Sequence, residues 1–562
     1  METGYTYVIG MDMGTTNIKA IALRSDGTVC AEAALPSTHY NPGPAMQEQD
    51  AEEWWDHVCV ILKAVAEQLG AEEVNKIRGI CISSHTVSML PVTEDGIPLR
   101  RALTVQDARS YAEMDEIVEK IGYDRFVQIV GGQPALAFLP WKILWFKRHE
   151  PELYAKTRWY LQASSFINYR LTGVMVSDLD QALRTQCMDR DSMEWSGEIG
   201  KAAGVDFAKV LPPVKLSEEV IGQVTAQAAK ATGLKEGIPV LAGCSDALAA
   251  MAAIGLSRLG ECGESSGTTS LVFAGSTVKS PSDVPVVTRP CPIESIPWIF
   301  DAPIQASGSA INWFIDMMAA GEKEEAKSRG ISIYSYLNEL ALEAEPGSDG
   351  LFFFPYLQGE RAPLWNHYAS GMFIGMRLDM TRAQLARSVF EGTAYALRHV
   401  IETVREEGAQ VDCLRICGGG ARSRSWNRIK ASVLNLPVYV LNPTSGDVPV
   451  GDALLAATTV GMFSSLEEGV SKSIKVDEII EPDPEWVKVY DTLYPYYLKM
   501  YRDLDQDLKR LDETLLKMKE EARHSSGSAG SPDNAEEPWF VRACERAPPE
   551  ISRQCGRDSV LI

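Results

Sequence analysis

The sequence lacks several features that would assign it to common protein classes. Its 562 residues contain no apolar run of the roughly 18 residues needed to span a bilayer. Basic residues are outnumbered, with 54 Lys and Arg against 76 Asp and Glu, which gives a formal net charge of −22. Nucleic-acid phosphates and anionic membrane surfaces repel such a chain. We therefore expect neither a nucleic-acid partner nor a membrane partner.

Metal-binding and disulfide signatures are also missing. The 11 cysteines include no C-x-x-C pair, and the 7 histidines include no H-E-x-x-H motif. Cys413 and Cys417 are four residues apart in an expected strand, which suits buried thiols better than a metal site. No basic segment precedes the first apolar residues, so no secretory leader is expected. These absences predict a cytoplasmic chain in a reducing compartment, without structural zinc.

The common nucleotide-binding motifs are absent as well. Neither G-x-x-x-x-G-K-[ST] nor G-x-G-x-x-G occurs, so a P-loop or a Rossmann site is unsupported. Instead, a strand–turn–strand pattern surrounds Gly14–Thr16 and returns around Gly267–Thr269. The repetition suggests a duplicated domain with a boundary near residues 255–260. Strands that alternate with helices favour α/β architecture.

The first of these turns could bind phosphate. Its exposed backbone N–H groups and two hydroxyls can surround phosphate oxygens, and its glycine lets the backbone come close. Asp12 is placed to hold a hydrated Mg²⁺, which prefers carboxylate, water and phosphate oxygens. Lys19 either neutralises phosphate charge or points to solvent from its strand. Taken alone, such a turn is more typical of an ordinary hairpin.

Several short motifs, in their order along the chain, resemble those of the FGGY carbohydrate kinases, a branch of the actin, sugar kinase and heat-shock ATPase fold. The resemblance covers roughly residues 5–500. The most specific segments are residues 12–19, 243–246, 266–269, 359–363 and 418–423, supported by residues 107–109 and 171–173.

The resemblance implies an α/β fold of two ribonuclease-H-like, actin-like ATPase domains with a central cleft. Residues 1–256 would form the mainly sugar-binding domain, and residues 257–500 the mainly ATP-binding domain. A helix is expected over residues 501–523, and residues 524–562 have the composition of a disordered tail.

The resemblance also implies a catalytic role for Asp246. Phosphoryl transfer needs an aligned acceptor hydroxyl, a group that accepts its proton and stabilised phosphate charge. Asp246 would be the general base in a reaction that uses ATP and Mg²⁺. From the residues alone, Asp246 could instead cap a helix that begins at Ala247.

The implied nucleotide contacts come from both halves of the chain. Asp12 would hold the metal. The cofactor-binding residues would be Gly14, Thr15, Thr16, Lys19, Gly267, Thr268, Thr269, Gly308, Asn312, Gly419, Gly420 and Ser423. Close helix packing at Gly308, a surface amide at Asn312 and a strand-to-helix turn at Gly419 and Gly420 are the structural alternatives.

The acceptor would be a small carbohydrate. The implied contacts are Ser84, His85, Thr86, Asp107, Arg109 and Asp246. Xylulokinases carry Gln-Met-His-Gly where this chain has residues 85–88, so the set of polar contacts differs from theirs. The expected reaction is phosphorylation of a ketopentose such as xylulose, a polyol or a sugar acid. The alternatives are a gluconate or other sugar-acid kinase, and a non-catalytic, nucleotide-dependent regulatory protein on the same fold, which would not need Asp246.

The C-terminal apolar residues follow a seven-residue repeat. They are Tyr497, Tyr501, Leu504, Leu508, Leu511, Leu515 and Met518. The spacing favours a terminal helix that lies on its own domain over a short coiled coil that would join a homodimer.

Overall fold

The computed structural model describes residues 4–281, 284–293, 295–443 and 445–525. The chain forms two compact units. The first contains residues 1–259, 276–299 and 444–475, and the second contains residues 260–275, 300–443 and 476–562. Of the predicted tail over 524–562, residues 524 and 525 end helix α20 and residues 526–562 lie outside the described residues.

The first unit is built on a central sheet with the order β13-β14-β5-β1-β2-β3. β1 pairs antiparallel with β2 and parallel with β5, which in turn pairs with β14 and β15. The strands are β1 (Tyr7–Met13), β2 (Asn17–Arg24), β3 (Val29–Pro36), β5 (Ile77–Ser84), β13 (Val220–Gln223), β14 (Pro239–Leu241) and β15 (Cys244–Ser245).

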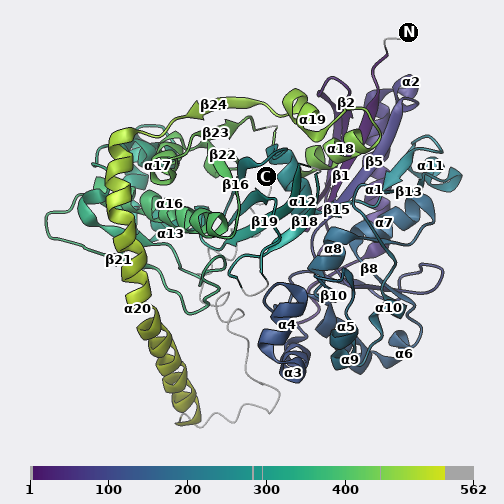
Figure 1. Ribbon diagram of the computed structural model, residues 1–562, viewed down its shortest axis with the longest axis horizontal. Helices are drawn as coiled ribbons and strands as arrows, with labels where there is room; N and C mark the ends of the chain where they lie inside the picture. Colours follow the sequence, from purple (N-terminus) through teal and green to yellow (C-terminus); the bar gives the residue numbers. More distant parts are fainter. Residues whose placement is uncertain (1–3, 282–283, 294, 444, 526–562) are drawn as a thin grey trace. The chain divides into compact units, whose positions relative to one another are not determined.

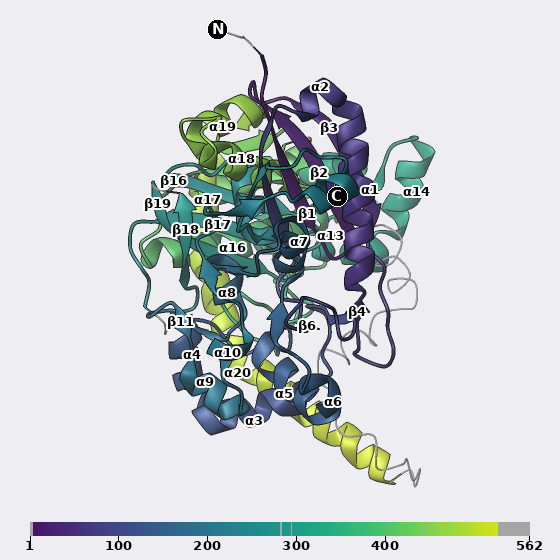
Figure 2. The same cartoon turned by 90° about the vertical axis from the view of Figure 1, so that its right-hand side faces the viewer.

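Helices cover this sheet. Helix α1 lies across β2 and β3 and buries Trp54, Val58 and Leu62 (Figure 2). Asp50 caps it by accepting a hydrogen bond from the Glu52 amide over 2.9 Å. The helices around the sheet are α1 (Ala51–Leu69), α2 (Ala71–Val74), α7 (Ala163–Thr172), α11 (Ala226–Thr232), α12 (Asp246–Ile254), α18 (Val448–Thr459) and α19 (Leu466–Ser473).

Residues 444–475 return to the first unit, where α18 lies beside β1 and α12 (Figure 1). Two glycines permit this close packing. A Cβ on Gly10 would stand 1.9 Å from the Pro449 carbonyl oxygen, and one on Gly451 would stand 1.8 Å from that of Ala249. Because real Cβ atoms never come so near, any larger side chain would push α18 away from the sheet.

A subsidiary layer of short elements completes the first unit around a core that includes Trp141, Phe126 and Tyr160. Its helices are α3 (Tyr111–Ile121), α4 (Tyr123–Val130), α5 (Leu139–His149), α6 (Pro151–Tyr154), α8 (Leu179–Arg184), α9 (Gly197–Ala203) and α10 (Phe207–Val210). Its strands are β4 (Glu48–Gln49), β6 (Leu90–Val92), β7 (Ala102–Leu103), β8 (Trp159–Leu161), β9 (Ser177–Asp178), β10 (Met188–Asp189), β11 (Glu194–Trp195) and β12 (Val214–Lys215).

The second large sheet has the order β24-β23-β22-β16-β17-β19-β18, with β18 at Thr288–Ile293, and its first six strands repeat the order of the first sheet. β16 pairs antiparallel with β17 and parallel with β22, as β1 does with β2 and β5. The predicted duplication is therefore confirmed at the level of topology. The strands are β16 (Gly260–Ser266), β17 (Ser270–Ser276), β19 (Ile296–Ile304), β20 (Phe352–Phe354), β21 (Met372–Ile374), β22 (Val411–Cys417), β23 (Val438–Leu441) and β24 (Val476–Ile480).

The second unit ends in the long helix α20. Tyr490, Tyr494, Tyr497 and Tyr501 are buried in the core of this unit, whereas Leu511, Leu515 and Met518 are exposed. Only the first half of the predicted apolar repeat therefore packs on its own unit. The helices are α13 (Gly308–Met318), α14 (Ala320–Ser328), α15 (Ile333–Leu342), α16 (Arg382–Glu406), α17 (Arg424–Leu434) and α20 (Pro484–Ser525), with short 3₁₀ turns at Ser348–Gly350 and Gly420–Arg422.

Candidate active site

An acidic cluster lies at the carboxyl end of β1, a central strand of the first sheet. The strand register places Asp12 opposite Ser83 on one side and Lys19 on the other. Burial raises the pKa of Asp12 well above its usual range, and the charges of Asp246 and Asp447 raise it further. The fold thus gathers carboxylates from β1, α12 and the residue before α18, although mutual repulsion makes this costly.

Asp246 is the first residue of α12 and is half-buried. Its Oδ1 accepts a hydrogen bond from the Ala247 amide over 2.8 Å. The helix cap is Ser245, whose Oγ accepts from the Leu248 amide over 3.2 Å. The alternative role considered for Asp246, as the cap of a helix from Ala247, is therefore wrong. Ser245 takes that role.

The environment of Asp12 fits a bound cation. Its Oδ1 is buried and has no hydrogen-bond partner among the described residues. The neighbouring ammonium of Lys19 is paired with Asp447 and lies 3.6 Å from Glu32. A buried acceptor without a donor is costly, and a hydrated divalent cation would satisfy it. The donor set of carboxylate oxygens is the one that Mg²⁺ prefers.

The turn Gly14–Thr16 joins β1 to β2 beside this cluster. A Cβ on Gly14 would lie 2.6 Å from the Asn17 carbonyl oxygen and 3.1 Å from Asp12 Oδ2. Ser37 fixes the turn, because its hydroxyl donates to the Gly14 carbonyl and its amide donates to that of Thr16. The predicted turn is confirmed, and the carbonyls of its ends are tied back to the protein.

The corresponding turn of the second unit, Gly267–Thr269, is docked on the N-terminus of α13. The Gly308 amide donates to the Gly267 carbonyl over 3.1 Å, and the Ser309 amide donates to that of Thr268 over 2.9 Å. A Cβ on Gly308 would stand 2.5 Å from the Gly267 oxygen. Glycine is therefore required at 308 for packing, and this packing positions the turn. Asn312, one turn further along α13, accepts from the Tyr334 hydroxyl over 2.9 Å.

A buried ion pair lies behind this second turn. Lys430 Nζ donates to both oxygens of Glu264, over 2.9 and 2.7 Å, and both side chains are 1% exposed. Glu264 also accepts from Ser270, which donates as well to Ser307. Burial lowers the pKa of Lys430, although Glu264 opposes the shift. The network joins β16, β17 and the residue before α13, and so holds both ends of the turn.

The three consecutive glycines after β22 differ in their surroundings. Gly418 has a positive φ of 87° and approaches the Ser266 carbonyl, and Gly420 approaches Ser266 Oγ. Gly419 faces open space, since no atom lies within 4 Å of where its Cβ would be. Ser423 caps α17 by accepting from the Trp426 amide and donates to Asn338. Packing therefore explains two of the glycines but not Gly419.

The predicted sugar-binding loop follows β5. Ser84 is fully buried and accepts from Gln181 Nε2 over 2.8 Å, while Thr86 donates to Gln181 Oε1. His85 is 2% exposed, with Nδ1 2.9 Å from the Met13 carbonyl, so Nδ1 carries the proton. Burial lowers the pKa of His85 to about 4. Its Nε2 is a buried acceptor with no partner among the described residues.

Asp107 and Arg109 form a closed pair. Arg109 donates to both oxygens of Asp107 and to Glu48 over 2.9 Å, and its side chain is 5% exposed. Asp107 is fully buried and also accepts from the Gln47 amide. Lys142, whose pKa burial lowers to about 7, lies close enough to feel both this pair and His85. The two predicted contacts are thus engaged with protein groups.

Sequence reasoning missed Asp447 and Asp452. Asp452 is fully buried and accepts from the Ser83 hydroxyl over 2.7 Å. The duplication held a signal, because Asp246 begins the helix that follows β14 and β15, and Asp447 stands directly before the helix that follows β23. Asp447 joins Asp12 and Asp246 in one cluster only because residues 444–475 return to the first unit, and no local pattern shows that return.

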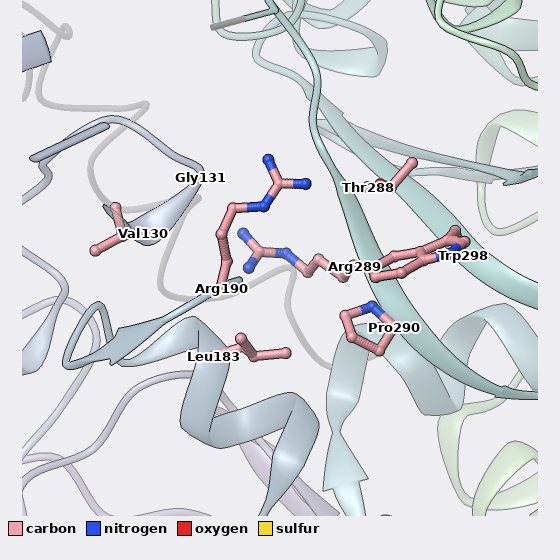
Figure 3. A pocket seen from close by; sticks show the side chains of 8 residues that line it. All are labelled: Val130, Gly131, Leu183, Arg190, Thr288, Arg289, Pro290 and Trp298. Atoms are coloured by element: carbon pink, nitrogen blue, oxygen red, sulfur yellow. The ribbon is translucent and has the colours of Figure 1, made fainter. Parts of the chain in front are cut away.

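A separate small pocket in the first unit contains none of the predicted site residues (Figure 3). Arg190 and Arg289 extend side by side into it next to Trp298. Arg190 donates to the carbonyls of Ser280 and Pro281, so its guanidinium holds a nearby loop. The remaining lining residues are Val130, Gly131, Leu183, Thr288 and Pro290.

Solved structures define the fold class. A xylulose kinase from Rhodospirillum rubrum is 31% identical, with a TM-score of 0.81 over 90% of this chain and 100% of that one. A ligand-bound xylulose kinase from Lactobacillus acidophilus is similar in fold, with a TM-score of 0.79 at 21% identity over 90% of this chain and 100% of that one. The predicted α/β class is confirmed, and the fold is that of actin-like ATPases.

Sequence comparisons give the family. The N-terminal domain of the FGGY family of carbohydrate kinases matches residues 7–255, and the C-terminal domain matches residues 264–460. Xylulose kinase from Bacillus subtilis (strain 168) is 30% identical over 509 residues, 90% of this chain and 99% of that protein. Gluconokinase from the same organism is 26% identical over 513 residues, 90% of this chain and 98% of that protein. The chain belongs to the FGGY family of carbohydrate kinases.

It follows that the protein is an ATP-dependent sugar kinase that acts on a carbohydrate substrate. None of the helices in the described ranges is both long enough and apolar enough to cross a membrane.

Proposed function

We propose that this kinase phosphorylates a neutral ketopentose such as xylulose, with Asp246 as the general base. The observation that carries the catalytic role is that the half-buried Asp246 lies close enough to Asp12 to raise its pKa, and that the buried Oδ1 of Asp12 has no hydrogen-bond partner among the described residues. A carboxylate in this position can align an acceptor hydroxyl and accept its proton.

Asp12 would hold Mg²⁺ through water, with Asp447 as an additional acidic neighbour. When bound, the ion would neutralise phosphate charge during transfer. Gly14, Thr15 and Thr16 would present N–H and hydroxyl donors to phosphate oxygens beside it. Lys19 is paired with Asp447, so its part in this proposal is to limit repulsion among the carboxylates.

The second unit would hold the nucleotide. Gly267, Thr268 and Thr269, positioned by α13 and by the Glu264–Lys430 pair, would contact the phosphates. Gly419 would let the backbone approach the nucleoside, which is supported by the open space beside it. Gly308, Gly420 and Ser423 would position these segments, and Asn312 would offer an amide contact.

The charges around the sugar-binding loop favour a neutral acceptor. Arg109 is already bound to Asp107 and Glu48, so the carboxylate of a sugar acid would have to compete with two carboxylates for it. His85 is neutral and offers Nε2 as an acceptor for a hydroxyl, beside Ser84 and Thr86. The names of the relatives include both xylulose kinase and gluconokinase, so a sugar acid is the second candidate. The cytoplasmic location and the homodimer stay predictions.

The test measures ADP release from MgATP with ketopentoses, polyols and gluconate. We expect rapid turnover with one ketopentose and its loss in Asp246→Asn. Asp124→Asn is the matched control, because Asp124 is an exposed aspartate in the first turn of α4 in the same unit. Turnover with gluconate alone would refute the neutral acceptor. ATP binding without turnover on any acceptor would favour a non-catalytic regulatory protein.

A further inference from the structure

Two thiols and a carboxylate form a buried cluster behind the acidic edge of the first sheet. Cys81 comes from β5, Cys244 from β15 and Asp452 from α18, and all three are fully buried. None of them belongs to the predicted nucleotide-binding or sugar-binding residues. The three segments are far apart in sequence, so the C-x-x-C spacing that marks many zinc sites could not reveal them.

The spacing of the ligand atoms matches that of a four-coordinate metal site. Each thiol sulfur lies 3.8 Å from Asp452 Oδ1, and all three ligand atoms lie within 4.8 Å of one another. Zinc–sulfur bonds of about 2.3 Å and zinc–oxygen bonds of about 2.1 Å at tetrahedral angles separate neighbouring ligands by about 3.6–3.8 Å. The three atoms therefore need only small movements to share one cation.

A fourth side chain orients the carboxylate. Ser83 Oγ donates to Asp452 Oδ2 over 2.7 Å and leaves Oδ1 directed at the two thiols. Hydrogen bonds of this kind to the non-ligating oxygen are typical of built metal sites, where they fix ligand orientation. In the metal-free chain the thiols act as weak donors to Oδ1.

We propose that Cys81, Cys244 and Asp452 form a binding site for a thiophilic divalent cation of the zinc class. On binding, both S–H bonds are lost, two metal–sulfur bonds and one metal–oxygen bond form, and the two thiol protons pass to the buffer together with the proton of Asp452 where that carboxyl is protonated. No group is oxidised or reduced. Thiolate ligands select such a cation over Mg²⁺, so this site differs from the carboxylate site at Asp12.

The cation would join α18 to the sheet. Because Asp452 belongs to the returning segment 444–475, the metal would link that segment to β5 and β15 by coordinate bonds. A ligand that binds only the folded chain raises its stability. The expected consequence is a higher Tm in the presence of Zn²⁺, whether or not the kinase proposal is correct.

The test uses the full chain, reduced and refolded from urea with Co²⁺ in the presence of excess Mg²⁺, which occupies carboxylate sites. We expect one equivalent of Co²⁺ with a thiolate-to-cobalt charge-transfer band that Zn²⁺ displaces. Cys81→Ser and Cys244→Ser should each lose the band and the Zn²⁺-dependent rise in Tm. Cys187→Ser is the matched control, since Cys187 is an equally buried thiol of the same unit that is hydrogen-bonded to the Thr185 side chain.

Circular dichroism of each variant verifies folding before the metal titration. If both serine variants fail to fold, the wild-type charge-transfer band and its displacement by Zn²⁺ decide the proposal alone. Absence of the band in the folded wild type would overturn it, as would a band that persists in a folded serine variant. If Cys81 and Cys244 form a disulfide in air and the reduced chain does not bind Co²⁺, the two thiols are a redox pair and the metal-site proposal is overturned.

Discussion

The two Gly-Thr-Thr turns occupy the same place in two sheets of equal topology, yet their surroundings differ. Gly14–Thr16 lies beside Asp12, whose pKa is raised by burial and by the charges of Asp246 and Asp447, and lowered by the charge of Lys19. Gly267–Thr269 lies in front of Glu264 and Lys430, a buried pair without net charge. One turn therefore borders an excess of negative charge, and the other rests on a neutral, fully bonded support.

This difference shows how a duplicated fold can divide a reaction. The acidic surroundings suit a cation and a proton acceptor, because both roles need carboxylates. The neutral support suits the positioning of backbone donors for phosphate, because it adds no charge that would repel an anion. The first turn is fixed by neutral groups such as His85, which donates to the Met13 carbonyl.

The largest effect on stability should come from breaking the support of the second turn. Lys430→Met leaves Glu264 buried without its cation, which should cost about 3–5 kcal/mol of unfolding free energy in urea titrations. The double variant Glu264→Gln/Lys430→Met should recover most of that loss. Equal stability of the single and double variants would show that the pair does not act as a unit.

Substitution of two glycines of the second unit distinguishes a glycine that packing requires from one that lets the nucleotide approach. Gly308→Ala places a Cβ against the Gly267 carbonyl and should cost about 1–3 kcal/mol while weakening ATP binding about tenfold. Gly419→Ala meets no protein atom and should leave Tm unchanged while it raises the KM for ATP. Unchanged ATP kinetics in Gly419→Ala would refute the approach of nucleotide to this residue.

Acid should weaken the support that neutral His85 gives the first turn through its hydrogen bond to the Met13 carbonyl. The folded pKa of His85, about 4, lies below that of the unfolded chain, so the unfolded chain takes up the proton first as the pH falls. Stability is therefore present above the unfolded pKa and is lost as the pH falls towards 4, by about 2 kcal/mol between pH 7 and pH 4.5. His85→Gln should lose much of this dependence in urea titrations at the two pH values. An unchanged slope would assign it to other groups.

The smallest effect concerns Asp12. Its raised pKa means that stability is lost as the pH rises from about 4 through the folded pKa. Asp12→Asn stays neutral and should therefore be about 1 kcal/mol more stable than the wild type at pH 8 without metal. Mg²⁺ should stabilise the wild type and not the variant.

The control for Asp12 is Asp26→Asn, at the other end of β2. Asp26 is paired with Arg24, which lowers its pKa to about 2, so this variant should not gain stability. A gain in both variants would reflect net charge rather than the local cluster.

The sequence predicted the parts of this molecule that local patterns encode. The turns at Gly14 and Gly267 and the duplication follow from alternation and turn residues within short windows. The helix considered from Ala247 begins one residue earlier, at Asp246, because Ser245 rather than Asp246 caps it. The predicted roles of the site residues rest on family resemblance and stay predictions.

Long-range pairing could not be predicted. Lys430 meets Glu264 across 166 residues, and Asp452 meets Ser83 across 369 residues. No pattern in either segment marks its partner, since burial of a charged group depends on what the fold brings to it. The return of residues 444–475 to the first unit has the same cause, because Gly10 and Gly451 matter only once α18 lies against β1 and α12.

The division of roles is tested most directly by measuring ATP affinity and turnover together in Asp246→Asn. Calorimetry gives the Kd for MgATP, and ADP release with the preferred sugar gives kcat. We expect kcat to fall by about 10²–10⁴-fold, as for the loss of a general base, while the Kd for MgATP stays within about twofold. A variant that keeps its kcat, or that loses ATP binding to the same extent as turnover, would contradict the assignment of Asp246 as the base.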